Sequence, residues 1–298
     1  MKEKIKGSLA LLFATVIWGF AFIAQSVGMD LIGPFTFQML RCSLAVLFLI
    51  PVSFLLDIGK CSMKESRDKW KNPALWKAGI ICGLALFAAS SLQQIGLVYT
   101  DAGKAGFLTA MYIVLVPLLG LFLGKKPGLT VWFSVVLAVL GLYLLCCANA
   151  AQINIGDLLI LGAALAFAVQ ITLIDRLATG LDGLRLNCIQ SLVCAALSAV
   201  MMAATETVEV SGIISCWLPL GYAGILSMGV AYSLQILGQR ELEPTAASLI
   251  MSLESVYAAI FGWLLLKETM AAREFLGCGM VFAAVILSQL PSRQKQHD

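Results

Sequence analysis

Long apolar runs recur along the whole chain and are separated by short polar segments. A helix of about 20 apolar residues is long enough to cross the hydrocarbon core of a bilayer. The first run follows Met-Lys-Glu-Lys-Ile-Lys and is too long for the apolar part of a typical signal peptide, so we assign it to the first span. The pattern predicts ten spans, at residues 7–27, 33–56, 75–98, 102–123, 130–148, 157–178, 184–204, 215–238, 244–266 and 272–290.

The composition agrees with this pattern. Of the 298 residues, 60% are hydrophobic and 12% are charged, and the mean hydropathy is +0.93. A soluble globular protein is closer to half apolar and a quarter charged. The sequence therefore predicts an all-α, multi-pass membrane protein whose surroundings are the lipid bilayer.

Motifs for enzymatic chemistry are missing from the sequence. The single histidine is His297, and no pair of the nine cysteines has the Cys-x-x-Cys spacing. The sequence also lacks H-E-x-x-H, G-x-S-x-G and the phosphate-binding loop of ATP-driven pumps. We therefore expect no catalytic residue, metal site, cofactor or nucleic-acid partner, and energy from a gradient or from a separate subunit.

Basic residues are distributed unequally between the two ends of the predicted spans. Sixteen lysines and arginines fall on the side that carries both termini, against three on the other side, and Arg41 falls within a span. Lys and Arg are enriched in cytoplasmic loops. The bias predicts that both termini are in the cytoplasm, as an even number of spans requires, and that the protein lies in the cytoplasmic membrane.

The two halves of the sequence resemble each other. A shift of 142 residues aligns Asp101–Lys126 with Glu243–Glu268 and Gln93 with Gln235, and a shift of 149 aligns Arg41 with Gln190. We therefore divide the chain into repeats at residues 1–148 and 149–298. Because each repeat has five spans, an odd number, the second must be inverted relative to the first. Inverted repeats are typical of transporters that alternate access around a central site.

Several local motifs resemble the EamA family of the drug/metabolite transporter superfamily. They are the Trp18-Gly19 pair, the spacing from Pro34 to Arg41, and the stretch SLESVYAAIFGWLLLKE, and the resemblance covers the whole chain as two EamA repeats. It implies a ten-helix fold with a substrate cavity between the halves. Family members often carry proline after the glutamate of this stretch, where this chain has Ser255, so the span 244–266 is expected to be straighter.

Two lone opposite charges lie at similar depth inside the predicted spans. Arg41 is about 12 Å and Glu254 about 15 Å from a membrane surface, at 1.5 Å per helical residue. Charges at such depth usually face the bundle interior and pair or contact water. We expect Arg41 and Glu254 to form an ion pair. A fixed structural pair is one interpretation, and contact with substrate or proton is the other; both hold if the pair forms in one conformational state.

Amide and aromatic side chains complete the candidate site. Each amide is also a candidate for hydrogen bonding between helices, and each aromatic ring for simple packing. The predicted substrate-binding residues are Trp18, Arg41, Gln93, Tyr112, Gln170, Gln190, Tyr232, Gln235 and Glu254.

The sequence favours a secondary transporter for a small-molecule substrate. The resemblance points to export of amino acids or related amphipathic compounds across the cytoplasmic membrane, and Glu254 suggests a proton as the coupling ion. Uptake of a nutrient or vitamin is an alternative. A receptor or assembly subunit that does not transport is an alternative from another class.

Overall fold

The computed structural model describes residues 2–100, 102–125, 127–146, 154–265 and 271–289, and this part of the chain contains helices and no strand. The elements are α1 (Lys2–Met29), α2 (Pro34–Leu55), α3 (Met63–Lys69), α4 (Pro73–Gly96), α5 (Ala102–Ala110), α6 (Tyr112–Phe122), α7 (Leu129–Cys146), α8 (Ile155–Leu177), α9 (Gly183–Thr205), α10 (Val210–Ser215), α11 (Trp217–Gly221), the π-helix η1 (Tyr222–Ala231), α12 (Tyr232–Gln239), α13 (Pro244–Met251), α14 (Leu253–Leu265) and α15 (Ala272–Gln289).

Each of the ten predicted spans is mostly helical in the part that the structure describes. Seven are single helices, and the other three are assembled from consecutive pieces: α5 with α6, α11 with η1 and α12, and α13 with α14. Nine of these segments are long and apolar enough to cross a membrane, and α7 is a shorter apolar helix. The predicted ten-helix class is confirmed. The short helices α3 and α10 lie between spans and have no counterpart in the apolar pattern.

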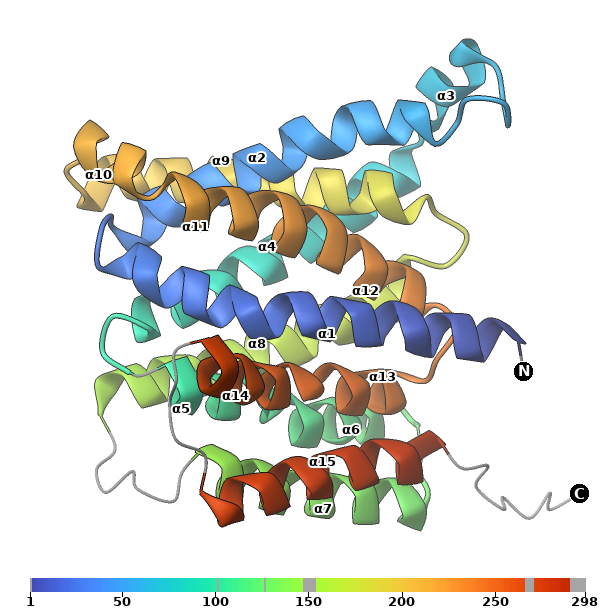
Figure 1. The fold of residues 1–298 in the computed structure, drawn as a ribbon. Helices are drawn as coiled ribbons and strands as arrows, with labels where there is room; N and C mark the ends of the chain where they lie inside the picture. Colours follow the sequence, from blue (N-terminus) through green and yellow to red (C-terminus); the bar gives the residue numbers. More distant parts are fainter. Residues whose placement is uncertain (1, 101, 126, 147–153, 266–270, 290–298) are drawn as a thin grey trace, which may run out of the picture.

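The repeat is visible in the packing of the helices. The shift of 149 carries α2 onto α9, and the shift of 142 carries α7 onto α15; each of these pairs packs together. Contacts between α4 and α8 correspond in the same way to those of α1 with η1 and α12. The halves therefore interlock. α1 begins and α15 ends at one end of the bundle, which we call the N-terminal end, and the opposite end is the far end (Figure 1).

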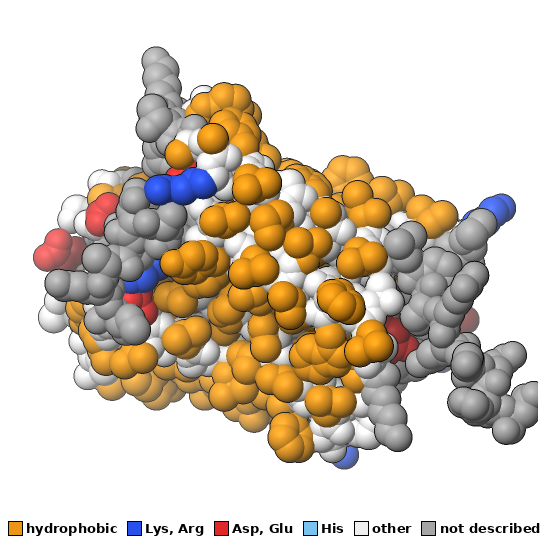
Figure 2. All heavy atoms as spheres, turned by 90° about the horizontal axis from the view of Figure 1, so that it is seen from below, with side chains coloured by type: hydrophobic (Ala, Val, Ile, Leu, Met, Phe, Trp, Pro, Cys, Tyr) orange, Lys and Arg blue, Asp and Glu red, His pale blue; other side chains and the backbone are white. Residues whose placement is uncertain are grey.

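The outer surface of the bundle is apolar between two polar ends. Figure 2 shows one face covered by hydrophobic side chains, with charged side chains only toward its two ends. Large apolar side chains point outward from several helices, among them Phe13, Phe133 and Ile286, each about two-thirds exposed at 65%, 68% and 65%. An apolar band of this kind matches the hydrocarbon layer of a bilayer.

Two spans are interrupted near their middles at matching places. The break between α5 and α6 is at Met111, and the break between α13 and α14 is at Ser252. Ser252 donates its hydroxyl hydrogen to the carbonyl oxygen of Leu249 at 2.8 Å, and serine bonds of this kind often bend helices. The span 244–266, expected to be straighter without a proline, is nevertheless broken two residues before Glu254.

Candidate substrate cavity

A cavity of about 50 Å³ lies between the two halves. Helices of both repeats contribute to its wall. The lining residues are Trp18, Phe22, Gln25, Arg41, Gln93, Thr109, Tyr112, Phe167, Ile171, Ser227, Tyr232, Gln235, Met251 and Glu254.

Seven of the nine predicted site residues line this cavity. They come from six spans: Trp18, Arg41, Gln93, Tyr112, Tyr232, Gln235 and Glu254. The other two, Gln170 and Gln190, are fully buried behind Gln235 and reach the cavity only through it. The predicted set is therefore one connected group of side chains.

Arg41 is held by neutral groups. Its Nη1 donates to the Oε1 of Gln25 at 2.5 Å, and its Nε donates to the Oε1 of Gln38 at 2.9 Å. The ring of Phe37 lies 5.8 Å from the guanidinium carbon. Arg41 is 3% exposed and lines the cavity, and it forms no ion pair with a described carboxylate.

Glu254 is also held by a neutral group. The hydroxyl of Tyr112 donates to its Oε1 at 2.9 Å, and Glu254 is 6% exposed. Tyr112 and Glu254 are 142 residues apart, so they occupy equivalent positions of the two repeats. The predicted ion pair between Arg41 and Glu254 is wrong in this structure, where neither forms a salt bridge with the other. Amide oxygens and a phenol satisfy the two charges instead.

A chain of buried amides extends from the cavity into the second repeat. Gln235 donates to Gln170 at 3.3 Å, Gln170 donates to Gln190 at 3.5 Å, and Gln190 donates to Asn187 at 2.9 Å. Asn187 in turn donates to the carbonyl oxygen of Met228 in η1 at 2.9 Å. Such a network fixes the orientation of the amide at the cavity wall, because each member is held by the next.

Two polar atoms of the cavity wall have no hydrogen-bond partner among the described residues. They are the indole nitrogen of Trp18, which is a donor, and the Oε1 of Gln235, which is an acceptor. The ring of Trp18 packs edge-on against Tyr232, with centroids 5.1 Å apart. A buried polar atom without a partner is costly. A ligand with an acceptor and a donor would satisfy both atoms.

Half of the residues that line the cavity were not predicted from the sequence, although alignment of the two repeats indicates some of them. The shift of 149 carries Trp18 onto Phe167 and Phe22 onto Ile171, and all four line the cavity. The shift of 142 carries Thr109 onto Met251, which both line it as well. Of the missed partners of Arg41, Gln38 has an amide counterpart at Asn187 under the shift of 149, whereas Gln25 falls on Ile174 and has none.

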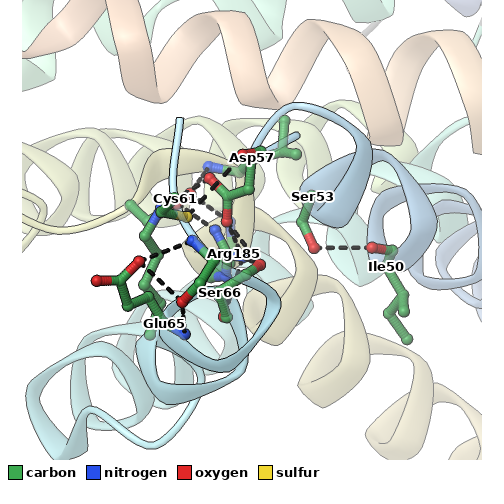
Figure 3. Close-up of polar contacts among 11 residues, drawn as sticks. Ile50, Ser53, Asp57, Cys61, Glu65, Ser66 and Arg185 are labelled. Atoms are coloured by element: carbon green, nitrogen blue, oxygen red, sulfur yellow. Dashed lines mark hydrogen bonds and ion pairs between the residues drawn. The ribbon is translucent and has the colours of Figure 1, made fainter. Parts of the chain in front are cut away.

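A second polar cluster joins the two halves at the N-terminal end (Figure 3). Arg185, in the first turn of α9 and 1% exposed, forms ion pairs with Asp57 at 2.7 Å and with Asp182 at 2.5 Å. It also donates to the hydroxyl oxygen of Ser66 in α3 at 2.9 Å. Lys69 pairs with Asp57 at 2.7 Å. Hydrogen bonds from Lys69 and Ser66, aided by Arg185, hold the pKa of Asp57 well below its ordinary value.

The family follows from comparison of the sequence with protein families. The model described as the EamA-like transporter family matches residues 5–147 and again residues 154–290. The chain belongs to this family. The described residues contain no cluster of three or more histidine, cysteine or acidic side chains that could hold a metal ion.

This EamA-like chain is similar over its length to two curated transporters. It is 30% identical to an uncharacterized transporter of Archaeoglobus fulgidus, over 97% of this chain and 87% of that protein. It is 22% identical to the uncharacterized transporter YoaV of Bacillus subtilis, over 98% of this chain and 99% of that protein.

A shorter match and a solved structure complete the comparison. The threonine/homoserine exporter RhtA of Escherichia coli is 33% identical over 59% of each chain. A solved crystal structure with 18% identity superposes with a TM-score of 0.77, covering 95% of this chain and 96% of that one. The latter supports the fold alone.

Proposed function

We propose that this EamA-like protein is a secondary transporter of the cell membrane that exports amino acids or closely related zwitterionic metabolites. The observation that carries the proposal is the arrangement of Arg41 and Glu254. Both line one cavity, each is held by neutral side chains, and they do not pair with each other. A cavity with one positive and one negative wall complements a molecule that carries both charges.

The polar atoms of the wall support the same class of substrate. A substrate carboxylate would accept from Arg41 and from the indole nitrogen of Trp18. A substrate ammonium would donate to Glu254 and to the free Oε1 of Gln235. Export, the amino-acid class and the absence of enzymatic activity are further supported by RhtA, which is a threonine/homoserine exporter.

Counterflow in sealed vesicles tests the substrate class. Proteoliposomes that contain only this protein are loaded with unlabelled amino acids, and uptake of labelled L-threonine and of a panel of other amino acids is measured. At least one amino acid should exchange. The methyl ester and the N-acetyl derivative of that amino acid should compete with it at least tenfold less well, because each derivative loses a charge-assisted contact of roughly 1.5–3 kcal/mol. Absence of exchange for the entire panel would favour a receptor or assembly subunit.

We also propose that Glu254 carries the coupling proton. It is a buried carboxyl group on the cavity wall, and its partner is a neutral phenol, so water that enters the cavity can exchange a proton with it. The variant Glu254→Gln should retain exchange at saturating substrate and lose accumulation driven by a pH gradient. Wild-type transport that ignores the pH gradient would refute proton coupling. A variant with normal kinetics in both assays would make Glu254 a structural residue.

A further inference from the structure

An apolar groove of about 410 Å³ opens on the outer surface of the bundle and shares no lining residue with the substrate cavity. Val46, Ile50 and Phe54, in the second half of α2, line one side of it. Ile189 and Leu192, in the first half of α9, line the other. Ile50 and Leu192 are also exposed on the outer surface, at 41% and 43%. The groove therefore opens toward the acyl chains of the bilayer.

Two tryptophans mark the end of the groove near the membrane boundary. Trp70 directly follows α3, and Trp76 lies in the first turn of α4, so both are close to where the chain re-enters the bundle. The indole nitrogen of Trp76 donates to the carbonyl oxygen of Trp70 at 2.6 Å. The buried indole nitrogen of Trp70 has no acceptor among the described residues. Tryptophan is enriched at the level of lipid headgroups.

A cation lies at the same end of the groove. Arg67 of α3 lines the groove, is exposed, and forms no ion pair with any residue that the structure describes. Its neighbourhood is basic: residues 57–77 contain six lysines and arginines and three acidic residues, and two of those acids, Asp57 and Asp68, are already paired with lysines. Basic pockets between membrane helices are typical sites for anionic headgroups.

We propose that this groove is a binding site for one anionic phospholipid of the leaflet at the N-terminal end. An acyl chain lies between α2 and α9, and Arg67 holds the phosphate. The apolar wall requires a chain, so a free phosphate does not fit the whole site. Arg67, the cation that lines the groove, favours an anionic headgroup, and a zwitterionic lipid fits less well because its own headgroup cation opposes Arg67.

Occupancy of this site would affect the polar cluster beside it. The ring of Trp70 lines the groove and lies 5.4 Å from the guanidinium carbon of Arg185. A lipid that orders Trp70 therefore also orders the ion pairs of Arg185 with Asp57 and Asp182. The bound lipid is expected to stabilise the contact between the two halves at this end.

Native mass spectrometry of the full-length protein tests the site. The protein is titrated in detergent with phosphatidylglycerol, phosphatidylcholine or inorganic phosphate, and bound adducts are counted. One phosphatidylglycerol should bind about fivefold more tightly than phosphatidylcholine, as expected for one basic contact. Arg67→Gln should remove that preference. The matched control Lys60→Gln removes an exposed charge of the same loop outside the groove and should leave it unchanged.

A second variant separates the groove from the charge. Leu192→Trp fills the groove and should weaken binding of both lipids, while its thermal unfolding without added lipid stays near that of the wild type because Leu192 is exposed. Equal losses in Arg67→Gln and Lys60→Gln would overturn the proposal. The proposal would also be overturned if millimolar phosphate displaced the lipid. It would likewise be overturned if the protein formed a dimer that Leu192→Trp abolished while lipid binding stayed unchanged.

Discussion

At the scale of single residues, the central contact of the cavity joins equivalent positions of the two repeats. Tyr112 begins α6 directly after the break at Met111, and Glu254 is the second residue of α14 after the break at Ser252. Their side chains meet at 2.9 Å. The hydrogen bond thus links the two broken spans at their breaks. A movement of one repeat relative to the other would therefore strain or break this bond.

Removal of the phenol hydroxyl should destabilise this contact. In Tyr112→Phe, the buried Glu254 loses the hydrogen bond that Tyr112 donates, which costs about 1–3 kcal/mol for an acceptor left without a partner. Thermal unfolding in detergent should show a lower Tm, and amino-acid counterflow should fall. The matched control is Tyr143→Phe in α7, where the residue is 53% exposed and its hydroxyl forms no hydrogen bond with another described residue. Equal behaviour of the two variants would contradict the role of Tyr112.

The sequence identified the charged residues of the cavity but not their partners. A lone arginine and a lone glutamate at similar depth are recognisable from hydropathy alone. Which group satisfies each charge depends on side-chain directions around the cavity, and the amides of Gln25 and Gln38 compete with a carboxylate for Arg41. The sequence shows how deep a residue lies along its helix, but not toward which neighbour its side chain points. The predicted ion pair between Arg41 and Glu254 is wrong for this reason.

At the scale of helices, close backbone contact holds α1 against α14. A methyl group at Gly19 would lie 2.6 Å from the Cβ of Tyr257 and 2.9 Å from the backbone nitrogen of Ala258. Small residues allow membrane helices to approach in this way. The contact places α1 directly beside the backbone of Glu254, whose carbonyl oxygen would be 3.0 Å from the same methyl group.

A methyl group at this position should push α1 away from α14. Gly19→Ala is expected to cost about 1–3 kcal/mol, because backbone atoms cannot rotate out of the way. The measurement is thermal unfolding together with counterflow. Gly279→Ala is the control: it lies in α15 with no atom within 4 Å of an added methyl group, and alanine favours the helix. A Gly19→Ala protein at least as stable as Gly279→Ala would contradict the close contact.

The cluster around Arg185 should make stability depend on pH. The pKa of Asp57 is held below its ordinary value, so its contribution is complete above roughly pH 4 and is lost as the pH falls through the folded-state pKa. Asp57→Asn should cost roughly 3 kcal/mol at pH 7, since Arg185 then loses a buried partner. Between pH 5 and pH 2, the Tm of this variant should fall less than that of the wild type.

An exposed ion pair provides the comparison for this cluster. Asp68 pairs with Lys71 at 2.8 Å with both side chains largely exposed, and such pairs contribute little. Asp68→Asn should therefore retain the wild-type stability and its pH dependence. If Asp57→Asn and Asp68→Asn gave the same pH profile, the Arg185 cluster would not be a stabilising contact between the halves.

Helix positions were predictable because burial in lipid requires long apolar runs. All ten spans were located, since hydropathy reports them directly. The breaks at Met111 and Ser252 were not predicted, because neither is a proline or glycine and each depends on local hydrogen bonding. Helix α3 was missed because six of its seven residues are polar, and its capping box from Ser62 to Glu65 lies in a loop without an apolar pattern.

At the scale of the whole molecule, the repeat explains how the helices pack, while the charge bias predicts how the bundle is oriented. The interlocked contacts of α2 with α9 and of α7 with α15 follow from an inverted repeat with approximate two-fold symmetry. Symmetry was predictable because the residue shifts are visible in the sequence. The assignment of the two ends to cytoplasm and exterior depends on the lysines and arginines and stays a prediction.

Thiol labelling of intact cells tests the orientation. Single cysteines replace Lys60 at the N-terminal end and Thr207 at the far end, both exposed, in a background without the native cysteines. An impermeant reagent should label the cysteine at position 207 and should label the one at position 60 only after the cells are opened, because basic loops favour the cytoplasm. The reverse pattern would place both termini outside.

We expect the cavity with Arg41 and Glu254 to be reached alternately from the two sides of the membrane. Ser227 lines this cavity in η1 and is 2% exposed, so Ser227→Cys in a cysteine-free background reports access to it. Labelling by an impermeant thiol reagent is measured in right-side-out and inside-out vesicles, with and without the amino acid that exchanges in counterflow. Alternating access predicts labelling from both sides and slower labelling when the amino acid is present. Labelling from one side only, at a rate that the amino acid does not change, would contradict alternating access to this cavity.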